Sequence, residues 1–229
     1  MLHGYTASIL EGAGLTLALA LLSLALAATL GLIGALAKLS RSRHAQRLAG
    51  LYTTLIRGIP DLVLMLLVFY GGQVAVNELA AKLGYDGYID IDPFVAGVIT
   101  IGFIYGAYLT ETFRGAFLAV PGGQREAGLA YGMSRGQVLR RIEMPQMLRH
   151  ALPALSNNWL VTVKSTAIVS VIGLNDMMQR ASQAAATTRE PFVFFAAVAL
   201  VYLLITSVSE LGFAALRRRT SAGVRAGSF

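Results

Sequence analysis

One uncharged segment, residues 12–37, limits what this chain can fold into more than any other feature. A helix needs about 20 predominantly apolar residues to cross the hydrocarbon core of a bilayer. Lipid offers the backbone no hydrogen-bonding partner, so a spanning segment must be helical or belong to a closed barrel. Long continuous apolar runs lack the alternation of barrel strands. The chain is therefore predicted to be an all-α membrane protein.

The composition supports several such segments. Of the 229 residues 55% are hydrophobic and only 14% are charged, whereas a soluble domain carries about 25% charged residues. Five stretches are predicted to span the membrane: residues 12–37 and about 57–81, 93–115, 151–176 and 191–216. The fourth stretch is the least regular because polar side chains interrupt it. We expect a polytopic protein with five transmembrane helices in one transmembrane domain, residues 1–229, and no soluble domain.

The basic residues are gathered in three of the polar gaps. The net charge is +7, and Lys and Arg concentrate at 38–47, 114–149 and 217–225, whereas the gap at 80–92 carries three aspartates. Cytoplasmic loops carry an excess of Lys and Arg. These three gaps are thus predicted to be cytoplasmic, with the N-terminus outside and the C-terminus in the cytoplasm. The same segregation argues against nucleic acid as a partner.

Motifs for covalent chemistry are missing or lack their context. The chain has no cysteine, which excludes a thiolate metal site, and no other metal site is predicted. Residues 132–136 match the G-x-S-x-G pattern of serine hydrolases, but that motif needs a preceding strand and none is predicted. No phosphate-binding G-x-x-x-x-G-K-[ST] occurs. We predict no catalytic residue here, and any ATP hydrolysis is expected on another polypeptide.

The longest polar interval, residues 120–150, lies between the third and fourth predicted spans. It has glycine at 128, 132 and 136, and this spacing is predicted to place them on one helical face where another surface approaches closely. The interval is too apolar for a disordered loop. We predict a short helix, a turn near residues 132–136 and a second short helix ended by Pro145, which together form a knob outside the membrane.

The interval contains the pattern E-A-G-x-x-x-G, then nine residues, then I-x-x-P, formed by Glu126, Ala127, Gly128, Gly132, Ile142 and Pro145. This pattern resembles the EAA loop of permease subunits of ABC importers. Gly128 replaces a usual second alanine, and Met144 replaces a usual leucine. The resemblance implies two cytoplasmic coupling helices that seat in a groove of a separate ATP-binding subunit, with Glu126 as the anchor and Gly132 at the turn.

The resemblance extends along nearly the whole chain. Residues 53–71, 108–117 and 157–177 are similar to segments of permeases for polar amino acids, above all those for histidine, lysine, arginine and ornithine. It implies one half of a type I importer in a bacterial inner membrane. The implied partners are an ATP-binding subunit dimer that carries ATP and Mg, a second homologous permease, a periplasmic or extracellular solute-binding protein, an amino-acid substrate and the lipid bilayer. No cofactor is expected in this chain.

Polar residues within the spans mark a candidate substrate pathway, because charge inside a membrane is costly. Asp61 begins a predicted helix and suits a cationic side chain, whereas Glu111 can pair with Arg114 at i+3. Lys164 is expected to pair with one of these carboxylates or to bind an α-carboxylate. Further candidates supply hydrogen bonds or aromatic faces: Tyr105, Asn157, Asn158, Trp159, Ser165 and Thr166. The alternative for each is a structural bond between helices.

Other functions fit part of the same pattern. Glutamine is an alternative substrate, and a channel or a non-transport membrane scaffold also accommodates five helices with a few charges. If the chain were a scaffold, the charged residues within the spans would have no functional effect. Co-purification with an ATPase that is lost on altering Glu126 or Gly132 would separate a transporter from both alternatives.

Overall fold

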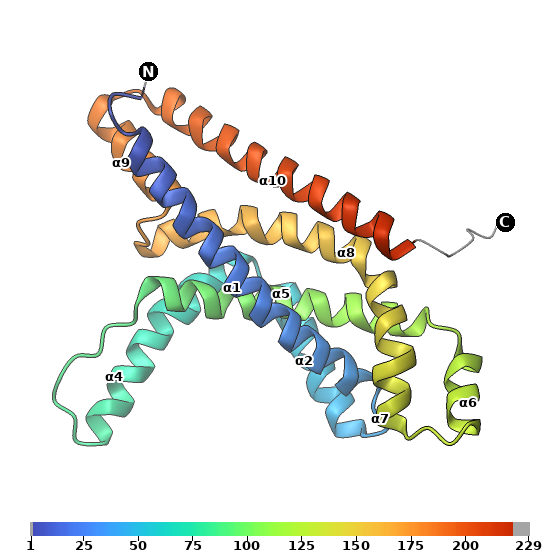
Figure 1. Cartoon of the computed structure of the whole chain (residues 1–229). Coiled ribbons are helices and arrows are strands. Elements are labelled where there is room, and N and C mark those ends of the chain that lie inside the picture. Colours follow the sequence, from blue (N-terminus) through green and yellow to red (C-terminus); the bar gives the residue numbers. More distant parts are fainter. Residues whose placement is uncertain (1, 222–229) are drawn as a thin grey trace.

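The computed structural model describes residues 2–221, which form helices joined by short connections (Figure 1). Within this range four helical stretches are long and apolar enough to cross a membrane: α1 (Thr6–Leu39), Asp61–Lys82, α5 (Pro93–Leu118) and Pro191–Thr220 of α10 (Pro191–Ser221). A fifth candidate is a bent pair, Arg135–Ile172 with Met177–Thr188, whose parts meet at 55°. The predicted all-α membrane fold is confirmed, with five spans when the bent pair counts as one.

The second span begins later than predicted. The helix α2 (Arg43–Gly58) precedes this span. The span itself consists of α3 (Asp61–Leu66), a π-helical turn η1 (Leu67–Gly71) and α4 (Gly72–Lys82). The backbone is extended at Ile59 and Pro60, because proline disfavours helical backbone at the residue before it. Arg57 therefore belongs to the separate helix α2, and the predicted start of the span at residue 57 is corrected to Asp61.

Amide side chains hold the connection between α4 and α5, residues 83–92, against α4. Asn77 donates to the carbonyl of Ile89 and accepts from its N–H, both at 2.8 Å. Gln73 accepts from the N–H of Ile91 at 2.8 Å. The two amides satisfy backbone groups much as a neighbouring strand would. The connection thereby has a defined course without regular secondary structure.

Helices α1 and α5 cross at the centre of the molecule and form much of its main core. A Cβ added at Gly31 of α1 would lie 2.6 Å from Cβ of Leu109, and one at Gly102 of α5 would lie 2.6 Å from Cδ2 of Leu26. A Cβ at Gly106 would also meet α1 and α2 side chains within 3.0 Å. Contacts this short leave no room for a side chain. Gly102 and Gly106 are small residues four apart in α5, and they therefore permit this close helix approach.

The polar interval continues directly into the fourth span. It comprises α6 (Gly122–Ala130), α7 (Arg135–Val138), a π turn η2 (Leu139–Glu143), α8 (Met144–Ser165) and a 3-10 segment η3 (Thr166–Ile172). From α7 to η3 the helix is uninterrupted. The predicted start of the span at residue 151 is thus only the point where the hydropathy rises, and residues 135–150 belong to the same helix.

Proline does not end this helix, so that prediction for Pro145 is wrong. A proline in a helix lacks an N–H, and its ring crowds the carbonyl four residues back. For Pro145 that carbonyl belongs to Arg141, which lies in the wider π turn, where the N–H of Met144 bonds to the carbonyl of Leu139. The π turn accommodates the ring. Pro153 lies further along α8, and Figure 1 shows the helix bending between α7 and the part labelled α8.

The last part of the bent span, α9 (Met177–Thr188), falls in a segment predicted as a loop. Gly173 has a φ of +92° at the break, and Asp176 caps α9 by accepting from the N–H of Gln179 at 2.9 Å. Arg180 of α9 donates to Glu11 of α1 at 2.9 Å. These bonds anchor the N-terminal end of α1 to α9.

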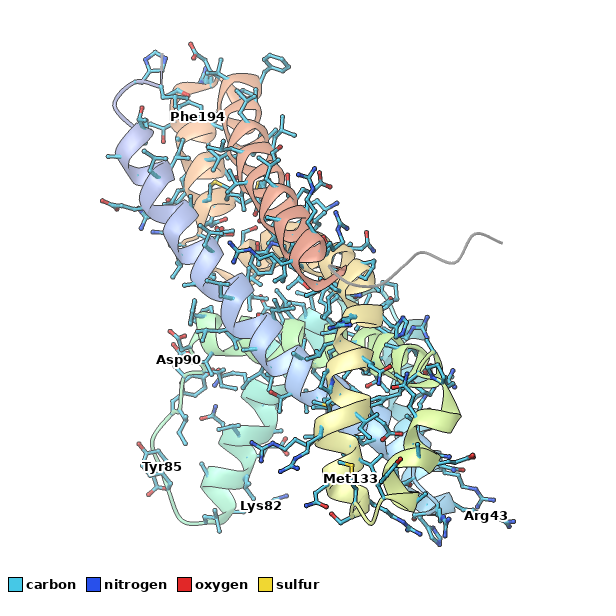
Figure 2. The ribbon with its side chains drawn as sticks, turned by 45° about the vertical axis from the view of Figure 1, so that its right-hand side comes forward. Arg43, Lys82, Tyr85, Asp90, Met133 and Phe194 are labelled. Atoms are coloured by element: carbon cyan, nitrogen blue, oxygen red, sulfur yellow. The ribbon has the colours of Figure 1, made fainter. Side chains whose placement is uncertain are left out.

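The basic gaps gather on one side of the molecule. In Figure 1 the α1–α2 connection, the α6–α7 segment and the end of α10 lie to the right, whereas the N-terminus and α9 lie to the left. Figure 2 shows Arg43 at the lower right and Met133 at the lower middle of the view, with Tyr85 and Asp90 of the acidic connection at its left. The fold therefore separates basic from acidic connections as the charge pattern requires.

Candidate functional site

Helix α6, the turn after it and α7 form a projection beside the spans, hereafter the α6–α7 projection (residues 122–138). Helix α6 ends at Ala130 with Tyr131 as its C-cap, and Gly132 follows with a φ of +83°. The N–H of Gly132 bonds to the carbonyl of Leu129 at 3.0 Å, and that of Met133 to the carbonyl of Gly128 at 3.1 Å. This pair of bonds is the Schellman motif, which places a left-handed residue after a helix. The turn predicted at Gly132 is present because glycine adopts that conformation without strain.

Ser134 begins the second half of the projection as a helix cap. Its Oγ accepts from the N–H of Gln137 at 3.3 Å, and Gln137 Oε1 accepts from the N–H of Ser134 at 2.8 Å. This reciprocal pair is a capping box, which satisfies two otherwise unpaired donors at a helix start. The preceding element is the helix α6 and not a strand, so the G-x-S-x-G match lacks its context.

The three glycines of this interval do not share one helical face, so that prediction is wrong. Gly128 lies in α6, Gly132 in the turn and Gly136 in α7. A Cβ at Gly128 would lie 2.7 Å from Cδ1 of Ile142 and 3.1 Å from Cγ2 of Val138. Gly128 thus lets α6 contact α7 and η2 within the chain. The equal spacing gave no sign that the chain reverses between them.

The outer surface of the projection is open. Tyr131 is 90% exposed, Leu129 is 42% exposed, and Glu126, Ala127 and Pro145 are exposed. Beside them is a shallow groove of about 500 Å³ lined by Gln124, Ala127, Gly128, Tyr131, Met133, Arg141, Ile142 and Gln146. Three of the predicted docking residues therefore line one groove, and Glu126 lies on the same helix. An exposed aromatic beside an apolar groove is typical of a protein-binding surface.

A second group of predicted residues meets between the spans. The hydroxyl of Tyr105 in α5 donates to Asp61 Oδ2 of α3 at 3.1 Å and lies 2.5 Å from Ser165 Oγ of α8. Tyr105 is buried, with 4% of its surface exposed, whereas Asp61 and Ser165 are partly exposed. We call Asp61, Tyr105 and Ser165 the Asp61 group. Three of the nine predicted pathway residues thus come from three different helices to one place.

Glu111 is engaged by cations at the other end of α5. It pairs with Lys38 of α1, and it accepts from Arg114 Nε at 2.9 Å, which confirms the predicted i,i+3 pair. Lys38 also donates to Thr53 of α2 at 2.6 Å. The ion pairs tie α1, α2 and α5 together. The position of Glu111 thus favours the structural alternative.

The remaining pathway candidates lie elsewhere. Trp159 is 6% exposed and packs with Ala20 and Val163 against α1 and α10. Lys164 is exposed, as is Asn157, and within residues 2–221 Lys164 forms no ion pair with Asp61 or Glu111. The predicted pairing of Lys164 with either carboxylate is therefore absent.

Two candidates act as bonds between helices. Thr166 is fully buried and lies 3.4 Å from the hydroxyl of Tyr202 in α10. Asn158 donates to Thr112 of α5 at 3.4 Å. These are the cross-helix bonds expected of polar residues in spans.

Sequence reasoning missed the neighbours that join α2 to this site. Arg57 of α2 lies over the ring of Tyr108, 5.2 Å from its centroid, and Tyr108 lies 5.7 Å from Tyr105 between centroids. Lys38 was assigned only to a basic gap, although it is the partner of Glu111. Nothing in the local sequence pairs residue 38 with residue 111, since that contact follows from the crossing of α1 and α5.

Comparison with known proteins agrees with this architecture. Residues 27–222 match the family described as binding-protein-dependent transport system inner membrane component. The histidine/lysine/arginine/ornithine transport system permease protein HisQ of Escherichia coli is 54% identical over 98% of this chain and 98% of its own length. The octopine transport system permease protein OccQ of Rhizobium meliloti is 38% identical over 98% of this chain and 94% of its own.

A solved structure has the same fold. The crystal structure of an amino acid ABC transporter with histidines contains a chain that is 32% identical, with a TM-score of 0.79, over 94% of this chain and 95% of that one. The resemblance to permease subunits of ABC importers is therefore confirmed over nearly the full length. On the family match and these relatives, the chain belongs to the family of binding-protein-dependent transport system inner membrane components.

Proposed function

We propose that this chain is a permease subunit of an ATP-driven importer of basic or polar amino acids such as histidine, arginine, lysine and ornithine. The observation that carries the proposal is one uninterrupted helix, from Arg135 to Ser165, that joins the α6–α7 projection to the Asp61 group. Relatives named as histidine/lysine/arginine/ornithine and octopine permeases support the substrate class. Glutamine is the second candidate substrate.

The α6–α7 projection docks onto a separate ATP-binding subunit in this proposal. Its exposed Tyr131 and the groove beside it offer an apolar surface, and Glu126 adds a charge on the same helix. The chain contains no phosphate-binding loop, so ATP and Mg are held by the partner. The complex contains two ATP-binding subunits and a second permease, which is homologous or identical to this chain.

The long helix then carries the motion of the ATP-binding subunit into the membrane. From residue 135 to residue 165 it extends roughly 45 Å along its path at 1.5 Å per residue. Ser165 at its far end contacts Tyr105 of α5. A displacement of α7 therefore shifts α8 against α5, which opens the pathway alternately to the two sides of the membrane. Pro153 lies inside α8, and a proline within a helix is a natural pivot because it removes a backbone hydrogen bond.

Asp61 supplies the selectivity for cations. Within residues 2–221 it forms no ion pair, and its only side-chain partner there is the hydroxyl of Tyr105. An intramembrane carboxylate without a basic partner favours a cationic ligand. Its position in the first turn of α3, where the helix dipole favours a negative charge, suits a carboxylate at this place.

The proposed orientation follows from the charges. The N-terminus, α9 and the acidic connection at 83–92 face the outside of a bacterial inner membrane, where a solute-binding protein delivers the amino acid. The α6–α7 projection and the end of α10 face the cytoplasm. The separation of these elements in Figure 1 is compatible with that assignment.

Uptake by the complete transporter in vesicles tests the role of Asp61. Arginine, histidine and glutamine uptake would be compared between the native protein, Asp61→Asn and the control Asp90→Asn, which removes an exposed charge from the acidic connection. Loss of a hydrogen-bonded charge partner costs about 1.5–3 kcal/mol, so Asp61→Asn should lower arginine uptake about tenfold or more while glutamine uptake changes less. An unchanged preference for cations in Asp61→Asn would remove Asp61 from the substrate site.

A further inference from the structure

A basic pocket lies between the α6–α7 projection and the inner end of α1. It has a volume of about 440 Å³ and is lined by Arg41, Arg125, Leu129, Arg135, Val138, Leu139 and Glu143. Its three arginines come from three separate elements, the α1–α2 connection, α6 and α7. Glu143 offsets one of the three positive charges. The pocket therefore keeps a positive excess that an anion would neutralise.

The backbone that carries Arg41 and Arg135 is held by hydrogen bonds. Ser42 accepts from the N–H of Ala45 at 3.4 Å, and Gln46 donates to the carbonyl of Ser40 at 2.8 Å, which holds the connection that carries Arg41. The capping box at Ser134 fixes the start of α7, where Arg135 is the first residue.

The arginines also remain available. Within residues 2–221 none of the three forms an ion pair, although Glu143 lines the same pocket. Five donors on each guanidinium favour a phosphate or carboxylate as the partner.

A second pocket continues the first toward the membrane. It has about 250 Å³ and is lined by Leu36, Leu39, Phe117, Leu118, Arg125, Leu139 and Glu143. Arg125, Leu139 and Glu143 line both pockets. The other four residues are apolar and come from the last turns of the spans α1 and α5. Leu118 is 62% and Leu39 is 39% exposed. An apolar recess at the ends of two spans thus leads directly to a basic one.

We propose that the two pockets together bind an anionic phospholipid, with its phosphate among the arginines and the upper part of an acyl chain against the leucines and Phe117. Basic pockets at the cytoplasmic ends of transmembrane helices bind anionic headgroups, and each Lys or Arg near the membrane surface contributes about fivefold to the affinity. The site lies beside the α6–α7 projection, so bound lipid would also steady the projection against the ends of α1 and α5. The proposal uses the same membrane orientation as the transport function but does not depend on the substrate.

The apolar recess favours a lipid over an acidic surface of another subunit. A protein carboxylate needs only the arginines, whereas the recess formed by Leu36, Leu39, Phe117 and Leu118 adjoins the hydrocarbon ends of α1 and α5. A free phosphate likewise leaves that recess without a ligand. The chemistry of a headgroup joined to an acyl chain matches both halves of the site.

Lipid binding to the assembled transporter tests the proposal. The complex, purified in detergent, would be titrated with phosphatidylglycerol and, separately, phosphatidylcholine, and bound lipid counted by native mass spectrometry. The variants are Arg41→Gln, Arg135→Gln and the control Arg43→Gln, which removes the same charge from an exposed position outside both pockets. Glycerol phosphate, a headgroup without chains, serves as the competitor that mimics a free phosphate.

The expected result is tighter binding of phosphatidylglycerol than of phosphatidylcholine. Arg41→Gln and Arg135→Gln should each weaken it about fivefold, Arg43→Gln should not, and glycerol phosphate should compete poorly. Equal binding by Arg41→Gln, Arg135→Gln and the native complex would overturn the proposal. So would efficient competition by glycerol phosphate, which indicates a phosphate site. Loss of the ATP-binding subunit from Arg41→Gln would also overturn it, since the arginines would then be a protein contact. Lipid binding is read without transport, so its failure is distinct from a failure of the transport assignment.

Discussion

Replacing Gly132 should weaken docking of the ATP-binding subunit through backbone strain alone. Gly132 has a φ of +83°, and a Cβ built on it meets nothing within 4 Å, so a side chain meets no obstacle inside the chain. Only the left-handed backbone penalises alanine, by about 1–2 kcal/mol. In Gly132→Ala the exposed turn is expected to leave the left-handed conformation when the projection is not docked. Docking must then restore that conformation, which costs this free energy. The dissociation constant of the two subunits should therefore rise about 5–30-fold.

The chain offers a matched control for this experiment. Gly136 in α7 is exposed, a Cβ there also meets nothing within 4 Å, and its φ is not in the left-handed region. Gly136→Ala should leave docking unchanged or slightly improved, because alanine suits a helix better than glycine. Gly132→Asn should lie between alanine and glycine, since asparagine tolerates the left-handed region.

The assay is a titration of the permease complex in nanodiscs with purified, fluorescently labelled ATP-binding subunit. If Gly136→Ala weakened docking as much as Gly132→Ala, the cause would be general disturbance of the projection. If Gly132→Asn were no better than Gly132→Ala, the side chain would collide with the partner. Either outcome would refute an explanation based on the backbone of Gly132.

Three further outcomes follow from the packing. Gly31→Ala should lower the unfolding free energy by about 1–3 kcal/mol through overpacking against α5, measured by thermal unfolding in detergent. Gly14→Ala in the same helix, where a Cβ meets nothing within 4 Å, is the control. Glu111→Gln should lower the unfolding free energy by about 1.5–3 kcal/mol, because it deprives the mostly buried Lys38 of its counter-charge. If the double variant with Lys38→Met were no more stable than Glu111→Gln alone, this explanation would be contradicted. Asn77→Ala should release the α4–α5 connection, seen as faster cleavage by an externally added protease, and an unchanged rate would show that the amide bonds do not hold it.

The features predictable from the sequence are those set by neighbouring residues. Hydropathy located the spans. The turn after α6 needs a residue with a positive φ, and the EAA pattern itself marks Gly132 as the turn. These predictions needed no knowledge of which helix meets which.

The features that escaped prediction depend on contacts between distant segments or on local backbone adjustments such as a π turn. Helix α9 has polar residues throughout one face, so its amphipathic character resembled a loop of mixed charge. The π turn that tolerates Pro145 has no composition signature. The Asp61 group joins residues far apart in the chain, and single-residue reasoning could name Tyr105 and Ser165 but could not place them beside one carboxylate. Contacts of this kind follow only from how the spans cross.

The central claim is that the α6–α7 projection faces the cytoplasm and contacts the ATP-binding subunit. This chain has no cysteine, so Tyr131→Cys, at a position that is 90% exposed, introduces the single thiol of this chain, and its labelling in the complete transporter is read on the band of this subunit. In right-side-out vesicles a membrane-impermeant thiol reagent should not reach it, and in open membranes a thiol crosslinker should join it to the ATP-binding subunit. Labelling from the outside, or no crosslink to that subunit, would contradict the account.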